Sequence, residues 1–206
     1  MKRRSWLAVM ALSLSSLVTV PAWAQAEAPD AMVKRLSNEV LSIIKTDPAV
    51  RDGDMSRIVS LVDSKIMPNV NFERLTTYTV GQYWTQATPE QRKQLQDEFK
   101  TLLLRTYSGA LGEVKDQTLS FKPFRARPED TEVVVRSEVR SANSQPVQLD
   151  YRLEKAATGW KIYDINVLGV WLGENYRTRF RQEASAKGVD GLIAWLVQQN
   201  KNMAGK

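Results

Sequence analysis

The sequence predicts an α+β fold, in which N-terminal and C-terminal helices flank a curved antiparallel sheet. Three observations predict it. Apolar residues recur at helical spacing from about residue 28 to 112. The period changes to two from about 115 to 168, and it becomes helical again up to about residue 200. Helices and strands that are segregated along the chain, with no repeat or linker between them, indicate one α+β domain.

The first 24 residues have the pattern of a cleaved secretory signal. A basic start, "MKRR", precedes the apolar run "WLAVMALSLSSLVTV", and Ala22 and Ala24 have the spacing that signal peptidase recognises. The run is too short to span a membrane comfortably, although an uncleaved anchor is the alternative. We therefore expect residues 1–24 to be removed, with Ala26 as the other candidate cleavage position. Residues 25–206 would then form a single domain in the periplasm.

Cysteine and histidine are both absent from the sequence. Without cysteine the chain forms no disulfide and carries no lipid-modified cysteine. Without histidine, Ser-His-Asp and Cys-His catalysis and most zinc and copper sites are excluded. Removing Lys2, Arg3 and Arg4 with the signal lowers the net charge from +6 to +3, so the charge does not indicate nucleic-acid binding. We expect no metal and no cofactor, and carboxylate or Ser-Lys chemistry are the enzymatic alternatives that remain.

Several helices are expected before the sheet. Each of the first two has its apolar residues on one helical face: Met32, Leu36, Val40 and Ile43, and then Ile58, Leu61, Val62 and Ile66. The second of them ends at Pro68, and a third begins at Asn71. The fourth has the clearest start, because Thr88 is a natural N-cap and Gln91 completes a capping box. It is expected to end near Gly112.

The strands alternate between apolar and polar residues. A short strand near 118–122 is interrupted by Pro123, and longer strands are expected over 131–140, 147–154 and 160–168. Short turns between these strands indicate an antiparallel meander with one apolar and one solvated face. Two helices should follow, the first ending at Gly188.

Segments along the whole predicted domain resemble the MlaC, or toluene-tolerance, family of periplasmic phospholipid carriers. They are "MPNVNFERLTTYTVGQYWTQATPEQRKQLQDEF", "LLLRTYSGAL", "PVQLDYRLEK", "WKIYDINVLGV", "NYRTRF" and "GVDGLIAWL". The resemblance runs from about residue 30 to 200 and implies an NTF2-like fold, with an apolar pocket between the sheet and the helices. It implies that the pocket takes phospholipid acyl chains and leaves the headgroup at its mouth.

The same resemblance implies a function and two protein partners. The protein would shuttle phospholipid between the outer and inner membranes and so maintain outer-membrane lipid asymmetry. It would exchange lipid with an outer-membrane lipoprotein complex and with the periplasmic domain of an inner-membrane ABC transporter. We expect it to be a monomer.

We expect the acyl chains to contact the apolar face of the sheet. The members of this face alternate along two strands: Val133, Val135, Val139, Val147, Leu149, Tyr151 and Leu153. Tyr107, near the end of its helix, is the helical aromatic residue expected to reach the pocket. Packing in a solid core is the alternative for the whole set, because periodicity alone does not distinguish a pocket wall from a core.

Three arginines are candidates for contact with the headgroup or with a protein partner. Arg177 and Arg181 lie one helical turn apart, and Arg125 lies in a turn. A solvated surface is the alternative for each of them. Where the family has a small residue after a Gly-Val turn, this chain has Val170 followed by Trp171. We expect both to line the pocket, with the indole pointing inward, and an outward plug is the alternative.

Asp164 is the single acid in the strand over 160–168. Strict alternation places Trp160, Ile162 and Asp164 on one face, opposite a more apolar face that contains Tyr163 and Ile165. We therefore expect Asp164 to point away from the pocket and to pair with an arginine or lysine. Two rival functions remain: an NTF2-like enzyme that acts on a small apolar substrate with Asp164 as the base, and a ligand-free adaptor with a solid core.

Overall fold

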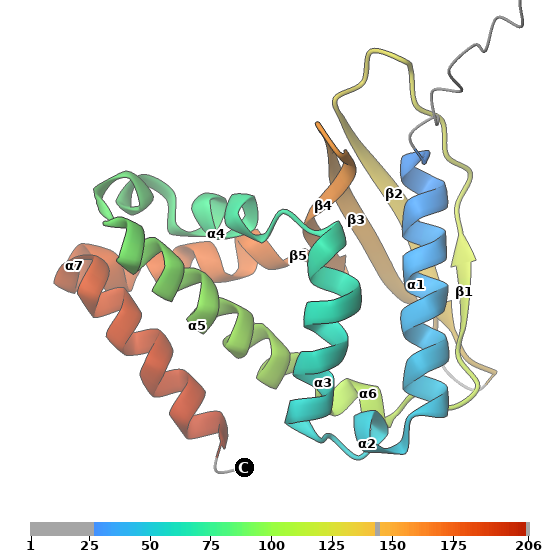
Figure 1. Ribbon diagram of the computed structural model, residues 1–206, viewed down its shortest axis with the longest axis horizontal. Coiled ribbons are helices and arrows are strands. Elements are labelled where there is room, and N and C mark those ends of the chain that lie inside the picture. Colours follow the sequence, from blue (N-terminus) through green and yellow to red (C-terminus); the bar gives the residue numbers. More distant parts are fainter. Residues whose placement is uncertain (1–26, 143–144, 205–206) are drawn as a thin grey trace, which may run out of the picture.

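The computed structural model describes residues 27–142 and 145–204 (Figure 1). The signal peptide predicted over residues 1–24 lies outside these ranges. Within the described ranges, no helix combines the length and the apolar character that crossing a membrane requires.

The N-terminal part of the described chain is helical, as predicted. Its elements are α1 Pro29–Thr46, α2 Pro48–Arg51, α3 Met55–Leu61, η1 Val62–Ile66, η2 Met67–Asn69, α4 Phe72–Val80, η3 Gly81–Gln86, α5 Pro89–Tyr107 and α6 Gly109–Gly112. The predicted starts are confirmed: the Asn71 side chain accepts the N–H of Arg74, and Thr88 and Gln91 form the capping box. The helix expected to run up to Pro68 is divided, because a π-helical turn over η1 follows α3.

The strands form one antiparallel meander, which confirms the predicted sheet. They are β1 Thr118–Phe121, β2 Glu132–Arg140, β3 Val147–Ala156, β4 Gly159–Val167 and β5 Val170–Trp171, hydrogen-bonded in this order. The short strand β5 was not predicted. It pairs back on β4 through Leu168 and Gly169, which have φ values of 54° and 88°. Two positive φ values between paired strands are the geometry of a tight hairpin turn.

A β-bulge changes which residues of β4 share a face. Leu153 pairs with Ile162 and Arg152 with Asp164, so Tyr163 is the extra residue. Ile162 therefore packs in the same cluster as Ile165, against α1. Tyr163 instead joins Asp164 on the opposite face. Asp164 points away from Ile165 as predicted, but strict alternation was wrong for Tyr163 and Ile162 because one extra residue shifts the pleat.

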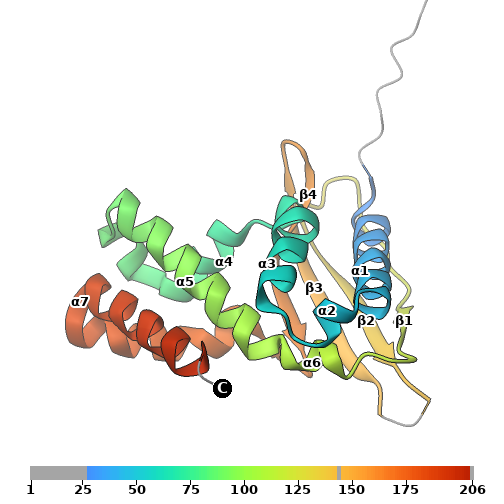
Figure 2. The ribbon, with the colours of Figure 1, turned by 60° about the horizontal axis from the view of Figure 1, so that its bottom comes forward.

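Helices cover both faces of the sheet. Figures 1 and 2 both show α1 against the sheet, and α4, α5 and α7 (Leu172–Ala204) gathered on the other side of α3. The start of α7 reaches the polar face, where the Gly173 N–H donates to Asp164. The predicted stop at Gly188 is a kink inside α7, where Lys187 and Gly188 leave helical geometry and Gly188 has φ 68°.

The buried apolar residues form three clusters. One joins α4, η3, α5 and α7 around Phe99 and Phe180. A second joins α1 to the sheet, and a third joins the end of α1 to α2 and α3. Val40 packs against both the second and the third cluster. The second and third clusters therefore meet at Val40, which is itself only half-buried.

Candidate functional site

Part of the predicted apolar face of the sheet is sealed by α1. Val135, Tyr151 and Leu153 are only 1%, 5% and 0% exposed and pack in one cluster with Met32, Val33 and Leu36 of α1. The Tyr151 hydroxyl also shares a hydrogen bond with the Ser37 hydroxyl, at 3.0 Å. In this structure these three residues have the solid-core packing that was the alternative to a pocket wall.

The rest of that face is only half-buried. Val133, Val139, Val147 and Leu149 keep part of their surface accessible. Other half-buried apolar side chains pack around the same region from α1, η1, α5 and β4. We call the following set the crevice residues: Val40, Ile43, Val62, Leu104, Leu149 and Ile165. They bring the unsealed part of the sheet together with helical positions that the sequence did not single out.

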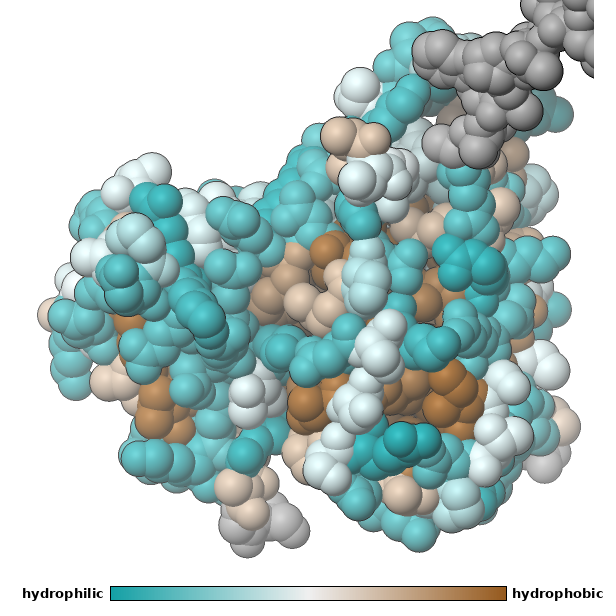
Figure 3. All heavy atoms as spheres, viewed as in Figure 1, coloured by the Kyte–Doolittle hydropathy of each residue, from teal (hydrophilic) through white to brown (hydrophobic). Residues whose placement is uncertain are grey.

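The crevice residues are linked through α1. Leu149, Ile165 and Val40 pack against the cluster between α1 and the sheet, and Ile43, Val62, Leu104 and Val40 pack against the cluster at the end of α1. Figure 3 shows hydrophobic side chains on both sides of α3, in the gaps toward α1 and toward α5. The helical layer therefore does not close completely over its apolar interior. Such a surface is suited to an apolar ligand, since it offers contact area and no reactive group.

Tyr107 lies half-buried at the end of α5. Burial raises the pKa of its phenol, and the neighbouring Tyr176 acts in the same direction. It therefore lies where α5 approaches the first half of α7. It is not a member of either hydrophobic cluster that contains the crevice residues.

Val170 and Trp171 do not have the predicted inward position. Val170 is 49% exposed beside the hairpin tip. The Trp171 ring lies under the Arg152 guanidinium, whose central carbon is 3.9 Å from the ring centroid. Because Arg152 also pairs with Asp164, this contact is on the polar face, away from α1. The inward orientation was wrong, since β5 turns back beside β4 and carries the indole over that face.

Asp164 has the structural pairing that was predicted for it. One carboxylate oxygen accepts the N–H groups of Ile165 and Gly173, at 2.9 and 3.1 Å, and the other lies 3.3 Å from Arg152. Burial raises the pKa of Asp164, while the two N–H bonds and the charge of Arg152 oppose that rise. With both oxygens engaged and 3% of the residue exposed, Asp164 joins β4 to the start of α7.

A second charged group on the polar face was not predicted. Arg74 of α4 pairs with Glu132 and Glu154, and its guanidinium stacks 3.7 Å above the Tyr163 ring. The Tyr163 hydroxyl also donates to Glu132, at 3.1 Å. This cluster holds α4 against β2, β3 and β4. No short stretch of sequence predicts it, because the bulge that turns Tyr163 toward Arg74 has no local pattern.

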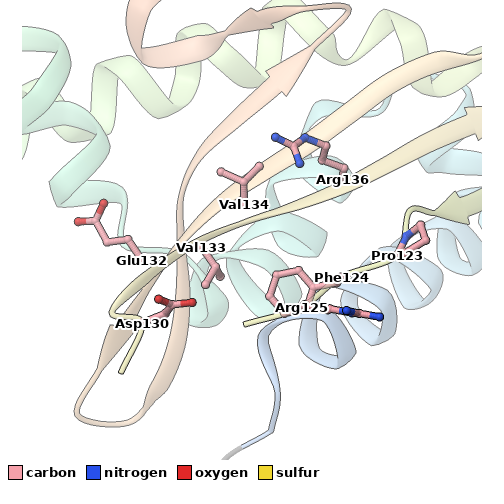
Figure 4. Close-up of a pocket in the computed structure, with 8 residues that line it drawn as sticks. All are labelled: Pro123, Phe124, Arg125, Asp130, Glu132, Val133, Val134 and Arg136. Atoms are coloured by element: carbon pink, nitrogen blue, oxygen red, sulfur yellow. The ribbon is translucent and has the colours of Figure 1, made fainter. Parts of the chain in front are cut away.

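The three candidate arginines occupy two separate hollows. Arg177 and Arg181 line a hollow of about 170 Å³ beside the end of α4, and Arg177 stacks on Tyr78 at 4.7 Å. Arg125 lines a hollow of about 350 Å³ beside β2 (Figure 4). None of the crevice residues lines either hollow. The structure therefore groups Arg177 with Arg181 and separates both from Arg125.

Comparison with known proteins decides the family. The sequence profile described as MlaC protein matches residues 34–198, which is most of the chain. The chain belongs to the MlaC family. A curated MlaC relative from Haemophilus influenzae, the intermembrane phospholipid transport system binding protein, is 23% identical over 95% of this chain and 92% of its own length. The toluene tolerance protein ttg2D of Pseudomonas putida is 25% identical over 80% of this chain and 77% of its own.

A solved structure supports the same MlaC assignment at higher identity. It is described as the phospholipid-binding protein from Ralstonia solanacearum in complex with a phospholipid. It is 49% identical, with a TM-score of 0.82, and the match covers 85% of this chain and 98% of that chain. The predicted α+β fold of the MlaC kind is therefore confirmed.

Proposed function

We propose that this protein is a periplasmic phospholipid carrier that shuttles lipid between the outer and inner membranes and thereby maintains outer-membrane lipid asymmetry. The observation that carries the proposal is the match, at 49% identity and over nearly the whole of that chain, to a structure in complex with a phospholipid. The name of the Haemophilus relative supports an intermembrane role. An outer-membrane lipoprotein complex and the periplasmic domain of an inner-membrane ABC transporter are the proposed partners.

We assign the acyl chains to the crevice residues and to the neighbouring half-buried part of the sheet, Val133, Val139 and Val147. These side chains present hydrocarbon from several elements and leave it partly uncovered. Filling the crevice with acyl chains would remove that surface from water, at about 25 cal/mol for each Å². The sealed residues behind them, such as Leu153, would provide a rigid wall.

The energetics suit a carrier that must release its ligand. Exposing acyl chains to water costs about 0.8 kcal/mol per methylene, or on the order of 20 kcal/mol for two chains. A membrane already shields these chains, so binding exchanges one apolar environment for another and the net free energy is small. The direction of transport must then come from the partners. No covalent step is part of the proposal, because both oxygens of Asp164 serve structural contacts.

Native mass spectrometry of the mature protein, purified after secretion to the periplasm, tests the proposal. We expect one population that carries the mass of a phospholipid and a second that appears only after extraction with organic solvent. A ligand-free adaptor would show the apo mass alone. A protein that is folded by circular dichroism and free of phospholipid in every preparation would contradict the carrier function.

A further inference from the structure

The π-helical turn η1 covers the crevice between α1 and α5. It follows directly on α3, and hydrophobic side chains are visible on both sides of α3, toward α1 and toward α5 (Figure 3). Val62, the first residue of η1, is a crevice residue and packs against the same cluster as Ile43 of α1 and Leu104 of α5. The position of η1 therefore decides how far this part of the crevice is open.

Two ion pairs join η1 to the helices on either side of it. The Lys65 ammonium lies 2.7 Å from the Glu39 carboxylate of α1, and the Lys100 ammonium of α5 lies 2.9 Å from the Asp63 carboxylate. Asp63 and Lys65 belong to the same turn. This turn thus contributes one charge of each sign, and each charge is paired with a different helix.

Both ion pairs lie beside crevice residues. Glu39 precedes Ile43 by four residues in α1, so the two side chains share a helical face. Lys100 precedes Leu104 by four residues in α5, with the same consequence. In η1, Val62 is followed directly by the first of the two charged residues. The ion pairs therefore span the two gaps at the edge of the crevice, next to its apolar side chains.

Other contacts hold η1 less firmly than the segments before and after it. None of its 5 residues is buried, whereas α3 buries Ile58 and Leu61. Beyond η1 and η2, the Asn71 N–H donates to the Ile162 carbonyl at 2.8 Å and fixes the chain to β4. Segments with few buried apolar contacts open most readily, and π-helical turns are frequent at functional sites. Of this cover, η1 is therefore the part that moves at the least cost.

We propose that η1 is a gate through which phospholipid enters and leaves the crevice, held closed by the Glu39–Lys65 and Asp63–Lys100 ion pairs. When both pairs separate, η1 moves away from α1 and α5 and joins the two gaps into one opening. All four side chains are partly exposed, so the pairs are weak and screened by salt, and opening is reversible. The inference rests on the proposed carrier function and adds the route that the lipid takes.

Reversible cross-linking tests the gate directly, because the chain has no cysteine of its own. The mature protein with Glu39→Cys and Lys65→Cys is joined by a short thiol cross-linker that a reductant cleaves. Uptake of a fluorescent phospholipid from vesicles of phosphatidylethanolamine and phosphatidylglycerol is then measured. We expect the cross-link to slow uptake by about tenfold or more, and the reductant to restore it. The matched control, Lys93→Cys with Asp97→Cys, cross-links an ion pair within α5 and should leave uptake unchanged.

Charge variants test the two ion pairs without a cross-link. Lys65→Gln combined with Lys100→Gln removes both pairs and should speed uptake and release by about threefold or more. Because both directions are faster, the lipid occupancy at equilibrium should not change. Raising the ionic strength from about 0.05 M to about 0.5 M should speed the wild type and leave the double variant unaffected. Lys93→Gln removes the exposed pair within α5 and should keep the wild-type rates.

The possible outcomes separate this inference from the proposed function. A wild-type protein that takes up no phospholipid would contradict the carrier function, and the gate with it. Wild-type uptake by the protein cross-linked between Glu39→Cys and Lys65→Cys would overturn the gate alone, as would wild-type rates in the double charge variant. Slow uptake that the reductant does not reverse would also count against the gate, because the substitutions rather than the cross-link would then be the cause.

Discussion

At the scale of single residues, Asp164 shows why an acid in an apolar strand is not by itself a catalytic group. Its carboxylate satisfies two backbone N–H groups and faces Arg152, which also lies 3.4 Å from Glu174 and stacks on Trp171. Together these contacts tie β3 and β4 to β5 and to the start of α7. A buried acid with this set of partners stabilises the fold, and its removal should affect stability before it affects lipid binding.

Two substitutions of Asp164 distinguish the contribution of its hydrogen bonds to stability from the contribution of its charge. Asp164→Ala leaves the Gly173 and Ile165 N–H groups without their acceptor and should lower the free energy of unfolding by about 2–3 kcal/mol. Asp164→Asn keeps that acceptor and should stay within about 1 kcal/mol of the wild type. Both proteins should retain phospholipid. Urea unfolding and lipid extraction measure the two quantities, and loss of a catalytic turnover in a folded Asp164→Asn protein would restore the enzyme hypothesis.

The stability difference between the wild type and Asp164→Asn should depend on pH, because the pKa of Asp164 is raised in the folded protein. A carboxyl whose pKa is higher in the folded than in the unfolded state binds its proton more tightly when folded. The stability of the wild type relative to Asp164→Asn should therefore fall as pH rises from the unfolded pKa, about 3.9, through the folded value, and then level off. Unfolding curves at pH 3.5 to 7 measure this difference, and a difference that rises with pH would contradict the assignment.

Trp171 is the position where sequence reasoning chose the wrong side of the sheet. Its ring stacks on Arg152 and stays partly exposed, so Trp171→Ser should cost about 1–3 kcal/mol, less than the truncation of a fully buried tryptophan. The profile of bound lipids should not change. Trp171→Phe keeps a stacked ring and should recover most of the stability. Thermal melts and lipidomics check both, and longer bound chains in Trp171→Ser would show that the indole does reach the crevice.

At the scale of elements, local chemistry predicted most of the secondary structure and missed what depends on neighbours. Thr88 with Gln91 begins α5, Asn71 begins α4, and the alternation along β2 and β3 gives strands with the expected faces. The bulge at Tyr163 and the π-helical turn of η1 each involve an extra residue. They arise from tertiary fit, which no short sequence window contains.

Gly188 interrupts α7, as its position in the sequence predicted, because its backbone adopts a conformation that favours glycine. It has φ 68°, which a residue with a Cβ adopts at a cost, and it divides α7 into two helical segments. Gly188→Ala should lower the free energy of unfolding by about 1–2 kcal/mol. In the helical turn α6, an added Cβ at Gly109 would meet open space, so Gly109→Ala should be neutral or slightly stabilising. Denaturant midpoints measure both, and equal effects of the two substitutions would contradict this account.

At the scale of the whole molecule, the apolar face of the sheet has two environments that periodicity could not distinguish. Leu149 and Leu153 lie on the same face of β3, yet α1 seals Leu153 and leaves Leu149 half-buried. The difference depends on where α1 crosses the strands, which is a property of packing. The helical members of the crevice, among them Val40, were visible in the sequence only as the apolar face of an ordinary helix.

Substitutions of Leu149 and Leu153 therefore make a matched pair, because the two residues share a face of β3 and differ in burial. A carboxylate placed among acyl chains must lose water or take up a proton, and either costs several kcal/mol. Leu149→Glu should fold and lose most of its copurified phospholipid, since the half-buried site gives the carboxylate access to water in the empty protein. Leu153→Glu should fail to fold. Circular dichroism with lipid extraction distinguishes these results, and full lipid occupancy in a folded Leu149→Glu protein would remove Leu149 from the site.

The most direct test of the central claim is to locate the bound lipid on the chain. The mature protein is loaded with a phospholipid that carries a photoreactive diazirine on one acyl chain, irradiated, and digested for peptide mass spectrometry. We predict adducts on the peptides that contain Val40, Ile43, Leu104 and Leu149, on α1, α5 and β3. Adducts concentrated on the polar face around Arg152 and Trp171, or in the hollow beside Arg177 and Arg181, would contradict the assignment of the crevice as the phospholipid site.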